Sequence, residues 1–336
     1  MGKFFFCCLL LPFTLIVYGQ QIKTISIDIE GARQIKLSEI AEKITPIVLD
    51  ATPGSIQNGS VFFIDNFIFV ASVSSIVQYD LSGKYIRSIN CGGFVTDNVT
   101  GDAVKKEIYV PVRNKIKCYD FSGKLKKEID LKTDIFHSLY YNNNLWVITN
   151  VNSDSTFTYS ISKINLSTGE ITPLSFEKKE GYMRFPNGKF VGIAPIVRFT
   201  QFNEAMIVSF SSDSLLYKIQ NDKVIPFVKW NISPPAKSDK DKIPLKANGF
   251  AGDFLFINYR REDQFFIYLE NMKTGQKFNA SNIIDDVYNT SNHCEIFPMY
   301  EPGYFLFIKD KNAIKGNSVG GKPLKNGSVI FIVKTK

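Results

Sequence analysis

The sequence predicts an all-β fold: a six-bladed β-propeller of four-stranded antiparallel blades, with the ring closed by an N-terminal strand. Three observations carry this prediction. A hairpin-turn motif recurs along the chain, an apolar segment precedes each copy, and a strand pattern near the N-terminus can complete the last unit.

The recurring motif is a short alternating strand, an Asp or Asn that enters a turn, and a Gly or polar residue that allows the chain to reverse. It is clearest as Asp-x-Ser-Gly-Lys at residues 80–84 and 120–124, and it returns near residues 169, 222 and 275. Gly at such a position adopts positive φ at no steric cost. Each copy therefore predicts the outer hairpin of one blade.

Six segments of higher hydrophobicity predict the buried inner strands, which should be more apolar than the alternating outer hairpins. They span residues 61–71, 107–112, 145–151, 205–210, 254–259 and 303–308. We count six blades because no seventh segment is found.

The last blade lacks one strand, and Ile44–Leu49 supplies it by pairing with Ser328–Val333. Such pairing removes the last free edge of the ring. Residues 37–44 are expected to form one or two helical turns, and the polar, Gly- and Lys-rich stretch 310–326 is expected to be a loop.

The N-terminus has the pattern of a secretory signal peptide, residues 1–19, followed by the propeller, residues 20–336. Lys3 precedes an apolar stretch from Phe4 to Tyr18, and Val17-Tyr18-Gly19 predicts cleavage before Gln20. An uncleaved anchor is the alternative, but the stretch is short for a membrane span. Cys7 and Cys8 lie too early for lipoprotein processing. We expect an exported protein, periplasmic or extracellular, with no transmembrane segment in the mature chain.

Composition excludes several function classes. The net charge is +8, but Lys and Arg are scattered and often adjacent to acids, so a solvated basic surface is favoured over a nucleic-acid interface. Cys91, Cys118 and Cys294 lack metal spacing and are expected to be buried free thiols. His137 and His293 are the only histidines, so no His-based metal site is expected. We expect no cofactor and no metal, and phosphate loops and nucleophile elbows are absent.

The chain resembles the secreted six-bladed β-propeller family widespread in Bacteroidetes, most of whose members have no assigned activity. The resemblance covers nearly the whole mature chain, in the order 37–49, 212–219, 254–275, 284–286 and 326–334. The sequence departs from the family after the first outer strand, where only Gly-Gly-Phe at 92–94 remains of a longer loop, and before the last strand, where a helix is missing. A binding face shaped by those parts would differ here.

Propellers usually bind at the channel mouth, so polar residues in loops are the candidates. Arg260 and Arg261, followed by Glu262 and Asp263, could hold an anion through an Arg fork, or form a solvated turn that the core does not need.

Two further sets could lie near the channel. Asp285 and Asp286, with His293 and Glu295 nearby, could serve acid–base chemistry, or could simply cap strand ends. Tyr182, Arg184 and Arg198 flank the fourth blade and suit sugars or acidic ligands, or are a packed Tyr with surface arginines.

The favoured function is therefore an exported, non-catalytic binding or interaction module of the cell envelope that recognises a glycan, peptide or protein partner at the propeller mouth. The alternative is an envelope lyase or hydrolase that uses channel carboxylates and Arg. The sequence does not distinguish a structural subunit of an envelope complex from the favoured binding module. It also leaves open whether the protein is an enzyme.

Overall fold

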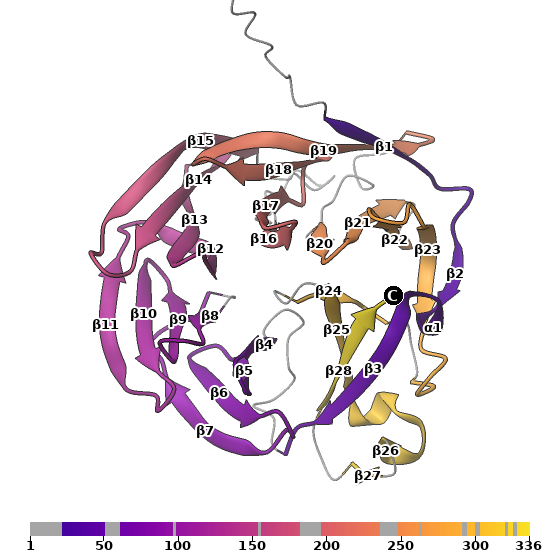
Figure 1. Cartoon of the computed structure of the whole chain (residues 1–336), viewed down its shortest axis with the longest axis horizontal. Helices are drawn as coiled ribbons and strands as arrows, with labels where there is room; N and C mark the ends of the chain where they lie inside the picture. The colour runs from indigo at the N-terminus through magenta and orange to yellow at the C-terminus, as the bar shows by residue number, and fades with distance from the viewer. Residues whose placement is uncertain are drawn as a thin grey trace, which may run out of the picture.

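The structure is a computed structural model that describes residues 22–50, 61–96, 99–153, 156–181, 196–235, 248–261, 264–290, 294–299, 303–319, 322–324 and 328–336. The expected signal peptide, residues 1–19, lies outside the described residues. Six sheets of four or five strands surround a central channel (Figure 1). This arrangement confirms the predicted all-β, six-bladed propeller.

In blades 1–3 the first strand faces the channel and the fourth lies at the perimeter (Figure 1). Blade 1 contains β4 (Val61–Ile64), β5 (Phe67–Ala71), β6 (Ser75–Asp80) and β7 (Tyr85–Asn90). Blade 2 contains β8 (Thr100–Asp102), β9 (Glu107–Val112), β10 (Lys115–Asp120) and β11 (Leu125–Asp130). Blade 3 contains β12 (Asp134–Tyr141), β13 (Asn144–Asn152), β14 (Thr156–Asn165) and β15 (Ile171–Gly181).

Blades 4 and 5 repeat this order, and blade 6 combines the two ends of the chain. Blade 4 contains β16 (Val197–Phe202), β17 (Ala205–Phe210), β18 (Leu215–Gln220) and β19 (Lys223–Ser233). Blade 5 contains β20 (Gly249–Ala251), β21 (Phe254–Arg261), β22 (Gln264–Asn271) and β23 (Lys277–Ile284). Blade 6 contains β24 (Phe297–Pro298), β25 (Tyr304–Asp310), β28 (Ser328–Thr335) and β3 (Ala41–Val48).

The recurring motif forms the outer hairpins, as predicted. In blade 1, Asp80 Oδ1 accepts hydrogen bonds from the backbone N of Ser82 at 2.8 Å, from Ser82 Oγ at 2.6 Å and from the backbone N of Lys84 at 3.1 Å. The hydroxyl and amide donors lower the pKa of this carboxyl below its usual value. Gly83 has φ +88°, and a Cβ there would come within 2.0 Å of the carbonyl oxygen of Val48. The turn therefore requires glycine at this position.

The apolar segments are the second strands of their blades, except 61–71, which spans both β4 and β5. These are inner strands, as predicted, and each second strand lies between the channel-facing first strand and the outer strands. All six residues of β17 are buried, and so are five of the six in β9. A second strand is covered on both faces by neighbouring blades, whereas the short first strand borders the channel, and this explains why the second strand is the more apolar.

Strand β3 closes the ring, which confirms the predicted closure. It pairs antiparallel with β28, and this register places Ile47 opposite Ile330 and Ile44 opposite Val333. Beyond the strand, the backbone N of Asp50 donates to the carbonyl of Gly83 at 2.9 Å. The closing strand is thus joined to blade 6 by its ladder and to blade 1 by this turn contact.

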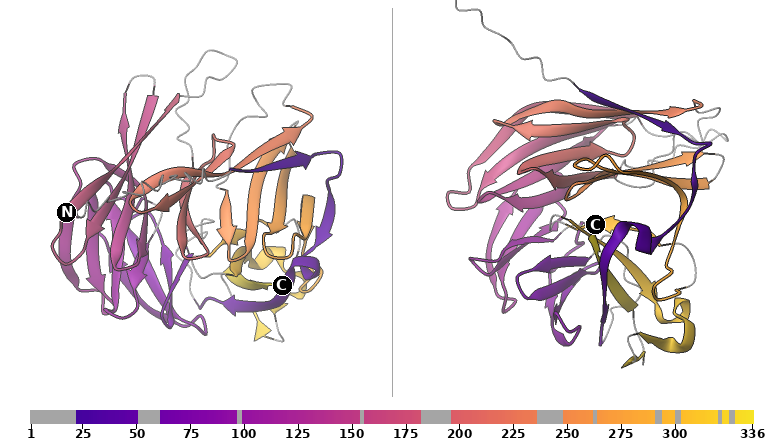
Figure 2. Two further views of the ribbon diagram at one scale, coloured as in Figure 1. Left: turned by 45° about the horizontal axis from the view of Figure 1, so that its top comes forward. Right: turned by 45° about the vertical axis from the view of Figure 1, so that its right-hand side comes forward.

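The chain before β3 adds two strands that the sequence analysis did not predict. Strand β1 (Lys23–Asp28) pairs parallel with β19, and β2 (Arg33–Lys36) pairs parallel with β23. The segment runs along the outside of blades 4 and 5 (Figure 2). The predicted helix is the single turn α1 (Leu37–Ile40). Within the described residues, no helix is long and apolar enough to cross a membrane.

The expected loop between β25 and β28 contains short regular elements. These are the 3-10 turns η2 (Lys311–Ala313) and η3 (Lys315–Asn317) and the small pair β26 (Ser318–Val319) and β27 (Lys322–Pro323).

The hydrophobic core is divided among the interfaces between neighbouring blades. Cys91, Cys118 and Cys294 are buried free thiols, as predicted. Burial raises the pKa of Cys91 to about 11 and the pKa of Cys118 and Cys294 to about 12. Such protonated thiols are poor nucleophiles and metal ligands.

Candidate functional site

The two mouths of the channel are built differently. Five of the six connections that enter the first strands are long, namely 49–60, 91–99, 182–196, 234–248 and 285–296, and the sixth, 131–133, is short. The turns that leave the first strands contain two to five residues. We call the first end the long-connection mouth. Binding residues in propellers concentrate in such connections, held by rigid strands.

Arg198 lies at this mouth, near the start of β16. Its Nη2 donates a hydrogen bond of 3.2 Å to the carbonyl oxygen of Pro298 on β24. The side chain therefore reaches from blade 4 to blade 6 across the channel. A guanidinium has five N–H donors. One is used here among the described residues, so up to four are left for solvent, for the neighbouring connections or for a ligand.

His137 on β12 is close to Arg198 and is only 1% exposed. Its ring centroid lies 5.4 Å from that of Phe199. Burial, followed by the positive charge of Arg198, holds the pKa of this imidazole well below its ordinary value. The sequence analysis considered His137 only as a possible metal ligand. The structure places one as a neutral, buried group beside the channel arginine.

Hydrogen bonds between neighbouring blades make the wall around Arg198 rigid. Thr100 Oγ1 accepts from the backbone N of Tyr140 at 2.8 Å, which joins β8 to β12. Thr200 Oγ1 accepts from the backbone N of Phe250 at 3.2 Å, which joins β16 to β20. Threonine side chains thus join two neighbouring pairs of first strands, β8 with β12 and β16 with β20.

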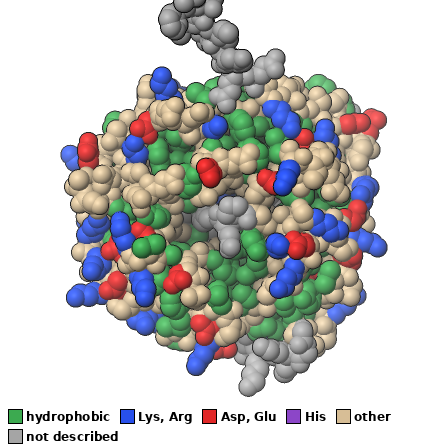
Figure 3. All heavy atoms as spheres, viewed as in Figure 1, with side chains coloured by type: hydrophobic (Ala, Val, Ile, Leu, Met, Phe, Trp, Pro, Cys, Tyr) green, Lys and Arg blue, Asp and Glu red, His purple; other side chains and the backbone are tan. Residues whose placement is uncertain are grey.

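The channel wall is polar on one side and apolar on the other. The first strands of blades 2–4 carry polar residues, namely Thr100, Asp102, His137, Ser138, Arg198 and Thr200. The first strands of blades 6 and 1 have the sequences Phe-Pro and Val-Phe-Phe-Ile. Figure 3 views the molecule from the opposite end, where hydrophobic side chains gather over β4 and β25 below the grey centre. On the two apolar first strands, β24 and β4, only Phe63 and Phe297 are partly exposed, and the other side chains are buried.

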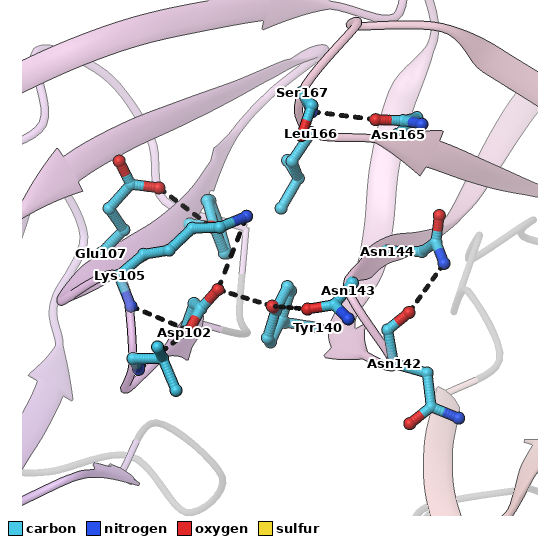
Figure 4. A network of polar contacts seen from close by, with 12 residues as sticks. Asp102, Lys105, Glu107, Tyr140, Asn142, Asn143, Asn144, Asn165, Leu166 and Ser167 are labelled. Carbon is cyan, nitrogen blue, oxygen red and sulfur yellow. Dashed lines mark hydrogen bonds and ion pairs between the residues drawn. The ribbon is translucent and has the colours of Figure 1, made fainter.

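A second polar network lies where blades 2 and 3 meet, at the opposite mouth (Figure 4). Asp102 is 4% exposed, and its Oδ2 accepts a 2.5 Å hydrogen bond from the Tyr140 hydroxyl. Its Oδ1 accepts from the backbone N of Val104 and of Lys105 at 2.9 and 3.0 Å. Burial acts to raise the pKa of Asp102, but the Tyr140 hydroxyl and the amides outweigh it and lower the pKa. The network fixes the turn between β8 and β9.

Arg260 and Arg261, at the end of β21, have different surroundings. The Arg260 guanidinium lies 5.6 Å from the ring centroid of Phe265, which is 43% exposed. Arg261 is 8% exposed and donates through Nη2 to the carbonyl oxygen of Pro234. The expectation that neither arginine belongs to the folded framework is wrong for Arg261, because its bond ties the blade 5 hairpin to the chain that follows β19. Glu262 and Asp263 lie outside the described residues.

Asp285 and Asp286 hold the loop after β23. The buried Asp285 accepts hydrogen bonds from the backbone N of Val287, Tyr288 and Thr290 at 3.1, 2.9 and 3.3 Å. Asp286 accepts from Ser38 of α1 through the backbone N at 3.0 Å and through Oγ at 2.6 Å.

These contacts connect the two aspartates to their own loop and to the N-terminal helix at the perimeter, and not to Arg198. His293 lies outside the described residues. So do Tyr182 and Arg184, so Arg198 is the one described member of its predicted set. In the described part of the chain, no three His, Cys, Asp or Glu residues are grouped closely enough to hold a metal ion.

The comparisons with known proteins identify the fold. No protein-family model and no curated protein matches the chain. The structure resembles that of a Bacteroides fragilis protein classed as exported, with a TM-score of 0.67 and 12% identity over 94% of this chain and 100% of the other. A DUF4221 family member from Bacteroides vulgatus gives a TM-score of 0.51 and 10% identity over 88% of this chain and 97% of the other.

A luciferin-regenerating enzyme gives a TM-score of 0.49 and 10% identity, over 88% of this chain and 97% of the other. At these identities the likeness supports the propeller fold alone, because the same fold carries many unrelated functions.

Proposed function

We propose that the protein is an exported binding module of the cell envelope that recognises an anionic glycan or an acidic peptide at the long-connection mouth. Arg198 is the observation that carries this proposal. It is a charged side chain on a rigid first strand, it reaches into the channel, and it retains donors that a carboxylate or sulfate can accept.

The wall opposite Arg198 supports the same class of ligand. Sugar rings and peptide side chains both present apolar faces beside polar groups, and the partly exposed Phe297 of blade 6 and Phe63 of blade 1 could contact such faces. Binding sites typically combine such apolar walls with few, well-placed polar groups. The guanidinium would fix the orientation of the ligand, and the apolar wall would contribute buried area.

Export is the second part of the proposal. The pattern at residues 1–19 supports it, and so does the classification of the Bacteroides fragilis neighbour as exported. The intact mass of the protein isolated from its native host tests this part. A mass that begins at Gln20 is expected, whereas a mass that retains residues 1–19 or carries a lipid contradicts simple export.

The binding test uses an array of acidic and neutral glycans and a library of acidic peptides, probed with the mature protein. For any ligand found, Arg198→Gln should weaken binding by about 10- to 100-fold, the effect of one lost charged hydrogen bond. Arg198→Lys should recover part of the affinity, because it keeps the charge and loses the planar fork. Lys229→Gln, on the exposed side of β19, is the matched control.

Melting curves of all three variants separate binding from folding, since Arg198 also contacts Pro298. If Arg198→Gln binds every ligand as well as the wild type does, the mouth is not the recognition site. Binding to neutral and acidic ligands alike would contradict the proposed ligand class.

A further inference from the structure

Two neighbouring turns of blade 2 form a surface at the end of the molecule opposite the long-connection mouth. One joins β8 to β9 at residues 103–106, and the other joins β10 to β11 at residues 121–124. The backbone N of Phe121 donates to the carbonyl of Lys106 at 3.1 Å, so the two turns are in contact. We call residues 103–106 and 121–126 the blade 2 turn surface.

Blade 2 is strongly basic. Residues 100–133 contain nine Lys and Arg and five Asp and Glu, so they carry four of the eight net positive charges of the whole sequence. Lys and Arg side chains follow the edge of the molecule over β10 and β11 (Figure 3). Residues 303–336 carry a larger excess, with seven Lys and one Asp, so the positive charge of the chain is concentrated in these two parts.

The acids of blade 2 are engaged in internal contacts. Asp102 is buried in the network of Figure 4, and Asp120 accepts hydrogen bonds from its own turn at 2.5, 2.9 and 3.0 Å. Glu128 pairs with Lys115 and Lys117 at 3.1 and 3.3 Å.

Three lysines on the blade 2 turn surface are exposed and form fewer ion pairs than the acids of the blade do. Lys106, Lys124 and Lys126 are exposed, and none forms an ion pair with a described residue. The surface therefore presents uncompensated positive charge.

The same turns expose apolar side chains between the lysines. Val104 is 93% exposed and precedes Lys105 and Lys106. Leu125 is 44% exposed and lies between Lys124 and Lys126. Both turns are held by aspartate hydrogen bonds to backbone amides, from Asp102 and Asp120, so the apolar side chains project from rigid positions.

From this pattern we infer that the blade 2 turn surface docks on an anionic lipid bilayer. Lysines attract anionic headgroups while their methylene stems lie along apolar surface, and apolar side chains between them enter the boundary with the acyl chains. An alternative role for these lysines is to prevent the outer strand β11 from pairing with a strand of another molecule. That role does not explain the exposed Val104, which lies in the other turn, between β8 and β9.

An acidic partner protein fits the surface less well. Protein interfaces take most of their binding energy from aromatic and Arg anchors that fill pockets, whereas these turns present a small aliphatic tip and mobile lysines. Docking through this end leaves the long-connection mouth facing away from the membrane.

The test is co-sedimentation of the mature protein with vesicles of equal parts phosphatidylglycerol and phosphatidylcholine, against vesicles of phosphatidylcholine alone. Binding to the anionic vesicles, reduced by salt, is expected. Each neutralised lysine should weaken binding by about fivefold, so Lys124→Gln with Lys126→Gln should weaken it by about 25-fold. Val104→Ser should weaken it several-fold without changing its salt dependence.

Matched controls use exposed residues of the same types in other blades. Lys223→Gln with Lys229→Gln on β19 removes two lysines, and Val73→Ser changes a residue that is 63% exposed in blade 1. Both controls should bind vesicles like the wild type.

Three results would overturn the inference: no binding to anionic vesicles, equal losses in the controls, or full binding by Val104→Ser. Full binding by Val104→Ser would mean that the lysines alone attract the vesicles. The surface would then suit an acidic protein as well as a bilayer.

Discussion

Ring closure by β3 can be tested by two truncations that remove different parts of the N-terminal segment. A chain that begins at Leu37 lacks β1 and β2 but keeps α1 and β3. A chain that begins at Ala51 lacks all four elements. The shorter deletion leaves blades 4 and 5 with four strands each, like blades 1–3, whereas the longer one also leaves blade 6 with three strands and opens the ring.

The loss of unfolding free energy in each truncation can be estimated from the buried side chains that it removes. The first step removes Ile25, Ile27 and Ile35, which are 4%, 1% and 1% exposed. At about 1.5–3 kcal/mol for each buried aliphatic side chain, this costs roughly 5–9 kcal/mol as an upper estimate.

The second step removes Leu37, Ile40, Ile47 and Leu49, which are 0%, 1%, 7% and 0% exposed, and costs roughly 6–12 kcal/mol on the same basis. It also unpairs β28, whose Val329, Ile330 and Phe331 are fully buried. A domain is typically stable by about 5–15 kcal/mol. We therefore expect the first truncation to fold with reduced stability and the second not to form a stable monomer.

Size-exclusion chromatography, circular dichroism and melting curves measure both outcomes. A synthetic peptide of residues 37–50, added during refolding, should restore the monomer of the chain that begins at Ala51, because it supplies α1 and β3. A scrambled peptide is the control. If the two truncated chains are equally stable and both monomeric without peptide, the closure reasoning is refuted.

Two further predictions concern single side chains. Asp102→Asn should cost about 1–3 kcal/mol at neutral pH, because the buried carboxylate that accepts from Tyr140 is lost. The lowered pKa of Asp102 gives stability that is present above the unfolded-state value and lost as the pH falls through the folded-state value. The difference in unfolding free energy between wild type and variant should therefore shrink in acid, and a constant difference contradicts the assignment. Arg261→Ala should lower the melting temperature more than Arg260→Ala, since Arg261 is buried and bonded to Pro234; equal shifts would show that the burial of Arg261 contributes nothing.

The sequence predicted the features of the fold that have local signals. The turn motif at 80–84 needs Asp at its start and Gly at positive φ, and both requirements can be seen in the residues themselves. Closure by β3 was predictable because the C-terminal part of the sequence supplies one strand too few for the last blade, and a strand pattern near the N-terminus can provide it. The apolar segments identified inner strands because hydrophobicity reports burial on two faces, but hydrophobicity alone does not tell the first strand of a blade from the second.

The parallel strands β1 and β2 had no such signal. Each has only four or six residues, and their partners lie about 200–250 residues away in the chain. Alternating burial in β1 is typical of any half-exposed strand, so the pattern does not reveal the pairing.

The candidate site was predictable only in part, because loop residues of the same type have different roles in the folded chain. Arg198 and Arg261 look alike in the sequence, yet one reaches across the channel and the other ties a hairpin to the chain after β19. Asp285 and Asp286 follow a strand, as catalytic carboxylates often do, but their oxygens accept bonds from their own loop and from α1. A sequence gives the chemistry of a side chain but not the partner that it meets.

The two proposed surfaces are separate, and this separation can be measured. Arg198 lies near the start of β16, whereas the turn that carries Val104 follows the end of β8, and first strands run from the long-connection mouth to the other mouth. No described hydrogen bond or ion pair joins the blade 2 turn surface to Arg198. Lys124→Gln with Lys126→Gln should therefore leave ligand affinity unchanged, and Arg198→Gln should leave vesicle binding unchanged. If either variant changed both activities by the same factor, the effect would come from folding, and neither surface could be assigned from it.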